Sequence, residues 1–199
     1  MIESQLLQSG IKYIAGVDEA GRGPCAGPLV VAAVILKDPL SSLLKDVKDS
    51  KQLTSLQREQ LFEIVKSNSL AYSIIEISVE EIDMLGLHKC NVEGMRRAIN
   101  ALDICADYVL TDGYSIPGLT IPSLAVWKGD QVAVSISAAS ILAKVYRDRI
   151  MIELDKTYPK YGLANHKGYI TASHTAAIKK LGVLPIHRKS FANIAAIIG

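Results

Sequence analysis

The sequence predicts a mixed α/β fold, in which one sheet is flanked by helices. Short runs of β-branched and aliphatic residues alternate with longer segments of helical periodicity. The 199 residues are 49% hydrophobic and 21% charged, which suits a globular protein with a substantial core. No internal repeat, low-complexity tract or linker divides the chain. We therefore expect a single domain over residues 1–199, with a helical C-terminal part from about residue 133.

The first half of the chain begins with two strands, at residues 13–17 and 29–36. They flank a glycine-rich loop closely enough to form an antiparallel pair. Residues 45–51 then make a charged connection. Thr54, with Gln57 three residues later, resembles a capping box at the start of an amphipathic helix.

The later elements follow from the same patterns. Ser78 with Glu81 marks a further helix start. Strand or extended character is expected at residues 70–79, 108–111 and 119–127, and helices at residues 88–102 and 135–158.

Charge is distributed unevenly along the chain. The net charge is only +2, but residues 1–143 hold 12 Lys+Arg and 17 Asp+Glu, giving −5, whereas residues 144–199 hold 10 and 3, giving +7. A basic C-terminal part suits a polyanionic partner, although a solvated basic surface explains the same counts.

The sequence also disfavours several classes of protein. Cys25, Cys90 and Cys105 are odd in number and widely spaced, which predicts neither a disulfide framework nor a zinc site. The N-terminus lacks the pattern of a secretion signal, and the apolar run at residues 29–36 is too short to cross a bilayer. We expect a cytoplasmic protein that does not contact membranes.

Two adjacent acids and a glycine-rich turn are the most informative feature. Asp18 and Glu19 end an apolar strand and run into Gly21, Arg22 and Gly23. Carboxylate oxygens are hard ligands for Mg²⁺ or Mn²⁺, and backbone N–H groups beside an arginine can hold a phosphate.

Two further acids stand at similar places. Asp112 and Asp130 each stand where an apolar strand gives way to a turn, so strands side by side could bring all four carboxylates to one edge of the sheet. Such a cluster would repel itself unless divalent cations neutralised it, and a pair of ions is the arrangement used for in-line displacement at phosphorus. Alternatively, each acid simply ends its own strand, because Asp favours turns.

The helix expected at residues 135–158 is apolar except for one narrow face. Ser137, Ser140, Lys144, Arg147 and Asp148 share that face at 100° per residue. Hydroxyls and bases in a row suit contact with a phosphate backbone. A solvated stripe held by a Lys144–Asp148 pair is the alternative.

The basic end also contains histidines and an aromatic residue. We interpret the histidines, among them His166, His174 and His187, as surface or hydrogen-bonded residues rather than catalysts, since none has metalloprotease spacing. Tyr169, beside glycine and lysine, could lie flat on a sugar or base, or could be a core residue.

Two other classes of function compete with a metal-dependent nuclease. A dinucleotide-dependent oxidoreductase is suggested by the glycines at 21, 23 and 27, but the third glycine is out of register and a strand, not a helix, is expected to follow. A non-catalytic nucleic-acid-binding module explains the basic end but leaves the acids without a role.

Taken together, the motifs resemble those of the ribonuclease HII family over about residues 14–191. The matching stretches are VDEAGRGP at 17–24, DSK at 49–51, TDG at 111–113, KGD at 128–130, SAASILAKV at 137–145, HKGY at 166–169 and HRKSF at 187–191.

The resemblance implies a ribonuclease H-like fold, with a mixed five-stranded sheet flanked by helices and a helical C-terminal part. It implies an endonuclease that hydrolyses the RNA strand of RNA–DNA hybrids with two Mg²⁺ or Mn²⁺ ions. It also implies cutting 5′ of single ribonucleotides in duplex DNA, which leaves 3′-hydroxyl and 5′-phosphate ends and belongs to ribonucleotide excision repair and DNA replication. We expect it to act as a monomer.

The resemblance also implies roles for individual residues. Asp18, Glu19, Asp112 and Asp130 become the catalytic, metal-binding acids. Substrate contacts fall to the Gly21, Arg22 and Gly23 loop, which senses the ribose 2′-hydroxyl, to Tyr169, which stacks on the sugar after a ribonucleotide, and to Lys51, Ser140, Lys144 and Arg147 at the phosphates.

Overall fold

The fold is built on one mixed five-stranded sheet, as the sequence predicts. The computed structural model describes residues 2–199, without the side chains of residues 48–52. The strands are β1 (Ile14–Ala20), β2 (Leu29–Leu36), β3 (Ser69–Ile77), β4 (Tyr108–Asp112) and β5 (Ser123–Val126). Their order is β3-β2-β1-β4-β5. β2 pairs antiparallel with β1 and β3, whereas β4 pairs parallel with β1 and β5.

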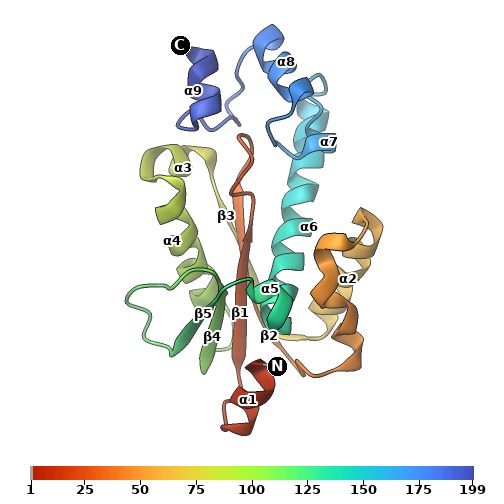
Figure 1. Cartoon of the computed structure of the whole chain (residues 1–199), viewed down its shortest axis with the longest axis vertical. Coiled ribbons are helices and arrows are strands. Elements are labelled where there is room, and N and C mark those ends of the chain that lie inside the picture. Colours follow the sequence, from red (N-terminus) through yellow and green to blue (C-terminus); the bar gives the residue numbers. More distant parts are fainter. Residues whose placement is uncertain (1) are drawn as a thin grey trace.

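Helices cover both faces of this sheet (Figure 1). In chain order they are α1 (Ile2–Gln8), the 3₁₀ helix η1 (Ser42–Gln52), α2 (Ser55–Ser67), α3 (Val79–Leu85), α4 (Leu87–Asn100), α5 (Gly129–Val132), α6 (Val134–Thr157), α7 (Leu163–His166), α8 (Ala172–Leu181) and α9 (Ala192–Ile198). α4 lies on one face, and α6 with α2 on the other.

Strand β2 shows how the sequence produces these layers. All eight of its residues are buried, because both faces of the strand are covered. Val31 belongs to the apolar cluster that includes Met95 of α4, whereas Val30 belongs to the cluster that includes Leu142 of α6. A strand buried on both faces reads as a continuous apolar run.

Helix α6 lies exceptionally close to β1. A Cβ on Gly16 would lie 2.1 Å from the backbone carbon of Ser135, so only glycine permits this contact. The first turn of α6 is also held by the N-terminal helix, because Ser135 donates to Glu3 Oε1 from its backbone N–H and its hydroxyl, both at 2.9 Å. The carboxylate satisfies an N–H that the helix itself leaves unpaired.

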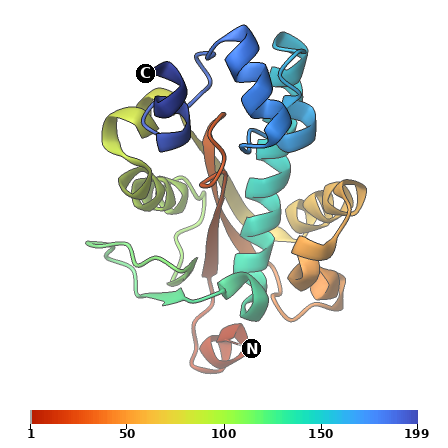
Figure 2. The same cartoon turned by 45° about the horizontal axis from the view of Figure 1, so that its top comes forward.

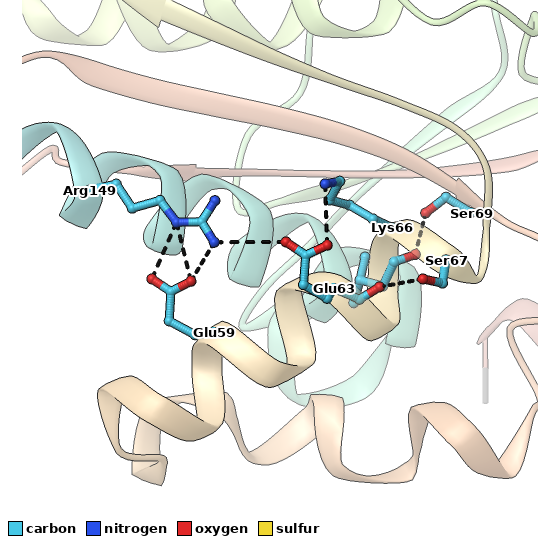
Figure 3. A network of polar contacts seen from close by, with 7 residues as sticks. Glu59, Glu63, Lys66, Ser67, Ser69 and Arg149 are labelled. Carbon is cyan, nitrogen blue, oxygen red and sulfur yellow. Dashed lines mark hydrogen bonds and ion pairs between the residues drawn. The ribbon is translucent and has the colours of Figure 1, made fainter.

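Helix α2 is attached to α6 by a charged network (Figure 3). Arg149 of α6 bonds Glu59 and lies 3.9 Å from Glu63, which also pairs with Lys66 at 3.3 Å. Such exposed pairs add little stability singly, but together they help to orient α2 on α6.

Most predicted starts and ends are confirmed. The Thr54 capping box is present, and Ser78 caps α3. The segment predicted as a plain connection is the helix η1, since 3₁₀ geometry puts Leu44 and Val47 on one buried side. Of the extended segment 119–127, only β5 pairs as a strand. Pro122 has no N–H to extend the ladder.

The C-terminal helices form a cap over one end of the sheet. Figure 2 shows α7, α8 and α9 gathered beside the β1–β2 connection. An isolated bridge joins Ala26 of that connection to His187, and a separate apolar cluster around Met151, Leu163 and Ile194 holds the cap together. No helix within residues 2–199 is long and apolar enough to span a membrane.

Candidate active site

Three of the four predicted acids meet at the ends of two neighbouring strands. Asp18 and Glu19 lie in β1, and Asp112 is the last residue of β4. The parallel register pairs Val17 with Thr111, which places Asp18 beside Asp112 on the next step of the ladder. The burial of Ala20 and Leu110 against α6 puts both carboxylates on the α6 side.

Glu19 points to the opposite face, because successive strand residues alternate. Its Oε1 lies 3.6 Å from Nη1 of Arg22, whose guanidinium stacks over the Tyr114 ring at 4.7 Å. The buried amide of Asn91, on α4, lies close enough to lower the pKa of Glu19. Oε2 of Glu19 is buried without a well-aligned donor in the described part of the chain.

Asp130 reaches the same end of the sheet through the turn after β5. Its side chain is 4% exposed in α5. The preceding residue, Gly129, donates its N–H to Asp112 Oδ1 at 2.7 Å, so this turn is tied to β4. Ser137 of α6 donates to the backbone oxygen of Asp130.

The carboxylates carry negative charge that the protein only partly compensates. Burial raises the pKa of Asp18 well above its ordinary value, and the charges of Glu19 and Asp112 raise it further. Burial also raises the pKa of Glu19 to about 7, with Asp112 adding to the rise and Arg22 opposing it. Ser140 of α6 lowers the pKa of Asp18 by hydrogen bonding.

This donor set fits hard divalent cations chemically, because buried carboxylates that repel one another gain most from a cation between them. As the side chains stand, no group of three or more His, Cys, Asp or Glu residues in the described structure is arranged to hold a metal ion. Asp112 bonded to Gly129 and Glu19 paired with Arg22 would have to turn toward a common point.

The β1–β2 connection, which begins with Gly21, Arg22 and Gly23, is held in place by two buried arginines. Arg147 of α6 donates to the carbonyl oxygens of Pro28, Lys167 and Ala26 at 3.0, 2.9 and 2.9 Å.

Arg188 is the second of these arginines. It donates to the oxygens of Gly27 and Arg22. Burial lowers the pKa of Arg147 to about 10 and that of Arg188 to about 9.

Arg147 therefore differs from its sequence-based interpretation as a phosphate contact. Arg147 lies in the wall of the cavity described below, but the residue is 1% exposed and its guanidinium is committed to three carbonyls, so it joins the β1–β2 connection to α6. Gly21 is adapted to it, with φ of +100° and an ideal Cβ position 2.1 Å from Arg147 Nε.

A cavity of about 420 Å³ opens between this loop and α6. Its lining includes Glu19, the Gly21–Arg22–Gly23 loop, Ser140, Lys144 and Tyr169. Tyr169 is 49% exposed, and its Cε1 lies 3.2 Å from the ideal Cβ position of Gly23, so the ring stands against the loop. The structure thus brings these predicted contact residues together.

The remaining stripe residues have individual surroundings. Lys144 pairs with Asp148 at 2.7 Å, as one interpretation expected, and still borders the cavity. Ser137 is buried and bonds the backbone. The side chain of Lys51 lies outside the described residues.

Sequence reasoning missed three residues. Arg58 lines the cavity from α2, Asn91 approaches Glu19 from α4, and Arg188 holds the loop. Only the HRKSF motif hinted at one of them. The dinucleotide alternative is excluded by the fold, since the glycine loop leads into strand β2 and not into a helix.

Comparisons with known proteins agree with this geometry. The sequence model of a family described as Ribonuclease HII matches residues 15–194. The chain is 50% identical to the Ribonuclease HII of Salinispora arenicola over 198 residues, covering 100% of this chain and 74% of the relative. It is 51% identical to that of Rhodococcus erythropolis over 195 residues, covering 98% and 86%.

A solved structure extends the likeness to three dimensions. The crystal structure of the ribonuclease H2 from Pyrococcus horikoshii OT3 superimposes with a TM-score of 0.82 at 31% identity, covering 94% of this chain and 97% of that one. The fold class predicted from the sequence is confirmed.

Proposed function

The chain belongs to the ribonuclease HII family, and we propose that it nicks duplex DNA on the 5′ side of single embedded ribonucleotides as well as cutting hybrids. Membership makes it a ribonuclease H, an endonuclease that acts on the RNA strand of RNA–DNA hybrids. The products of the proposed reaction carry 3′-hydroxyl and 5′-phosphate ends.

One observation supports this function most strongly. Burial and the charge of Asp112 raise the pKa of both Asp18 and Glu19, and Glu19 lines a cavity that Arg22, Arg58 and Lys144 also line. Negative groups alone would repel a phosphodiester, so the site makes chemical sense when cations lie between the acids and the substrate.

The family depends on divalent metals, and we assign their ligands to Asp18, Glu19, Asp112 and Asp130. A pair of Mg²⁺ or Mn²⁺ ions would activate the attacking water and neutralise charge on the leaving oxygen. To hold such ions, Glu19 would exchange its contact with Arg22 for the metal site, and Arg22 would then be able to contact a substrate phosphate.

Other residues of the chain hold and read the substrate. The backbone of Gly21, Arg22 and Gly23 contacts the nucleic-acid backbone around the scissile phosphate and senses the 2′-hydroxyl of the ribonucleotide on the 3′ side of the cut, the group that separates RNA from DNA. Tyr169 stacks on the next sugar. Lys144 and Lys51, with Arg58 added from the structure, contact phosphates by charge. The proposed enzyme acts as a monomer in the cytoplasm and takes part in the removal of ribonucleotides from DNA.

Nick mapping tests the proposal directly. Duplex DNA with one ribonucleotide is incubated with Mg²⁺, Mn²⁺ or chelator, and the products are sized on a denaturing gel. We expect a nick immediately 5′ of the ribonucleotide that chelator abolishes. Asp18→Asn and Asp112→Asn should each lower the rate at least about 100-fold, because each removes a ligand charge.

A matched variant controls for the loss of an acid. Asp103→Asn changes an exposed carboxylate outside the site and should leave the rate unchanged. Thermal unfolding gives a readout other than activity, since Mg²⁺ should raise the Tm of the wild type more than that of Asp18→Asn. Full activity of Asp18→Asn on the hybrid would refute the assignment of these acids.

A further inference from the structure

Three histidines lie together behind the segment that carries Tyr169. His166 ends α7, His174 lies in the first turn of α8, and His187 precedes α9. The rings of His166 and His174 stack at 4.1 Å, and Nε2 of His174 lies 3.1 Å from Nε2 of His187. His174 and His187 are fully buried. The proposed chemistry uses none of them.

The hydrogen bonds around His174 and His187 allow one protonation pattern. Nδ1 of His174 lies 2.9 Å from the carbonyl oxygen of Tyr169, so this nitrogen must carry a proton and donate. In a neutral ring Nε2 of His174 then accepts, and His187 must donate to it from its own Nε2. This leaves Nδ1 of His187 as the acceptor of the Leu184 N–H at 2.8 Å, the shorter of its two contacts with that residue, since the Leu184 oxygen lies at 3.3 Å.

The result is a directed relay of three hydrogen bonds. It runs from the backbone of Leu184 through His187 and His174 to the backbone oxygen of Tyr169. Protonation of His174 would set its Nε2–H against the Nε2–H of His187 at 3.1 Å, and protonation of His187 would set its Nδ1–H against the Leu184 N–H at 2.8 Å. Burial lowers the pKa of His174 to about 4 and also lowers the pKa of His187, which agrees with neutral rings.

Other neighbours of the relay fit the same pattern. His166 contacts the carbonyl oxygen of Tyr161 through Nε2 at 2.8 Å and accepts the Gly168 N–H at Nδ1 at 3.2 Å. The thiol of Cys25 lies 3.9 Å from His174 and donates to Gly168 O. All six ring nitrogens of the three histidines thus have hydrogen-bonding partners, which argues against a metal site here.

The backbone N–H and carbonyl groups of Gly168 and Tyr169 are consequently all hydrogen-bonded. The Gly168 N–H is bonded by His166, the Gly168 oxygen accepts from the Cys25 N–H at 3.0 Å, and the Tyr169 N–H donates to the His166 oxygen at 2.9 Å. The Tyr169 oxygen is bonded by His174. Tyr169 itself lines the cavity.

We propose that His174 and His187 are positioning residues that hold the Tyr169 ring in place for stacking on the substrate sugar. The inference rests on the proposed role of Tyr169. Thr171 assists by capping α8, since its hydroxyl accepts the His174 N–H at 3.1 Å and turns that residue back toward Tyr169. The relay restricts the loop before substrate arrives, so less ordering is needed on binding.

The first test needs no variant and no substrate. Imidazole ¹⁵N–¹H correlation spectra of the wild type at pH 7 report which nitrogen of each ring carries the proton. We expect Nδ1–H for His174 and Nε2–H for His187. An Nε2–H tautomer of His174, or a charged ring in either residue, would overturn the relay whatever the enzyme's activity.

The second test is a double-substitution cycle on the ribonucleotide-containing duplex. His174→Phe keeps a ring but removes both hydrogen bonds, and should lower kcat/KM about tenfold, toward the value of Tyr169→Ala. In a Tyr169→Ala background the same change should have almost no effect, because no ring remains to be positioned. A merely structural histidine would lower kcat/KM equally in both backgrounds.

A conservative variant supplies the rescue. The amide nitrogen of His174→Asn lies near the place of Nδ1 and can still donate to the Tyr169 oxygen, so this variant should recover most of the lost kcat/KM. If His174→Phe does not fold, His187→Phe, whose ring no longer donates to His174, takes its place in the cycle. An equal loss in both backgrounds for either variant refutes the proposal.

The outcomes separate this inference from the proposed function. If the wild type does not nick the duplex, or Tyr169→Ala cuts as fast as the wild type, the proposed role of Tyr169 fails, and the proposal that the histidines position it for substrate fails with it. If Tyr169→Ala is impaired but His174→Phe is not, only the inference about the histidines fails.

Discussion

Replacing Arg147 by methionine should destabilise the free protein strongly. The guanidinium makes three hydrogen bonds to backbone oxygens of Ala26, Pro28 and Lys167, at 2.9–3.0 Å. Bonds from a charged donor contribute about 1.5–3 kcal/mol each, or about 5–9 kcal/mol together. Methionine fills similar space but leaves these buried oxygens without donors.

The burial of the charge offsets part of this stabilisation. Burial lowers the pKa of Arg147 from its ordinary value to about 10. That change corresponds to a cost of about 3 kcal/mol for the charged form. The net loss expected for Arg147→Met is therefore about 2–6 kcal/mol in the free energy of unfolding.

Urea unfolding without metal or nucleic acid measures this loss, and Lys144→Met is the matched control. Lys144 lies on the same helix face but is 36% exposed and pairs with Asp148. Its replacement should change the unfolding free energy by less than about 0.5 kcal/mol. It should also reduce the salt dependence of hybrid binding, measured as the slope of log K against log salt concentration, by about one. If Arg147→Met unfolds like the wild type and instead shows that weaker salt dependence, then Arg147 is a phosphate contact after all.

Three further predictions concern other parts of the fold. Gly21→Ala should lower the free energy of unfolding by well over the roughly 1–2 kcal/mol that a positive φ costs alanine, because the added Cβ would lie 2.1 Å from Arg147. It should also lower the nicking rate. Urea unfolding and nicking assays measure the two effects. Glu3→Ala should cost about 1–3 kcal/mol, measured by thermal unfolding, because it leaves the Ser135 N–H at the start of α6 unsatisfied. Lowering the pH from 6.5 to 4 should reduce the free energy of unfolding by up to about 3 kcal/mol through His174. The reason is that this histidine binds a proton readily in the unfolded chain, whereas in the folded protein its pKa is about 4. His174→Phe should lack this part of the pH dependence.

Matched variants check the first two of these. Gly118→Ala places an alanine at φ of +72° with open space around it, so only the backbone cost should appear. A loss as large as that of Gly21→Ala would show that contact with Arg147 is unimportant. For the N-terminal helix, Glu3→Gln keeps an acceptor for Ser135 and should lose less than Glu3→Ala. Equal losses would mean that the hydrogen bond contributes nothing.

Features that depend on neighbouring residues could be predicted from the sequence. The alternation of apolar runs located β1, β2 and β4, and the Thr54 and Ser78 caps located two helix starts, because each of these features depends on residues within a few positions. The acids at the strand ends were identifiable for the same reason. Motif resemblance then supplied the family, which the comparisons confirm.

Contacts between distant segments were decided only by the tertiary structure. The helical periodicity placed Arg147 on a polar stripe, but its partners are backbone oxygens up to 121 residues away, and a carbonyl leaves no mark in the sequence. The same holds for Glu3 bonded to Ser135 across 132 positions and for Arg188 bonded to Gly27 across 161. Periodicity says which face of an element a side chain shares. Which groups it contacts there depends on how the layers pack. This packing decides whether an arginine is buried and bonded to backbone oxygens or is exposed and able to bind a phosphate.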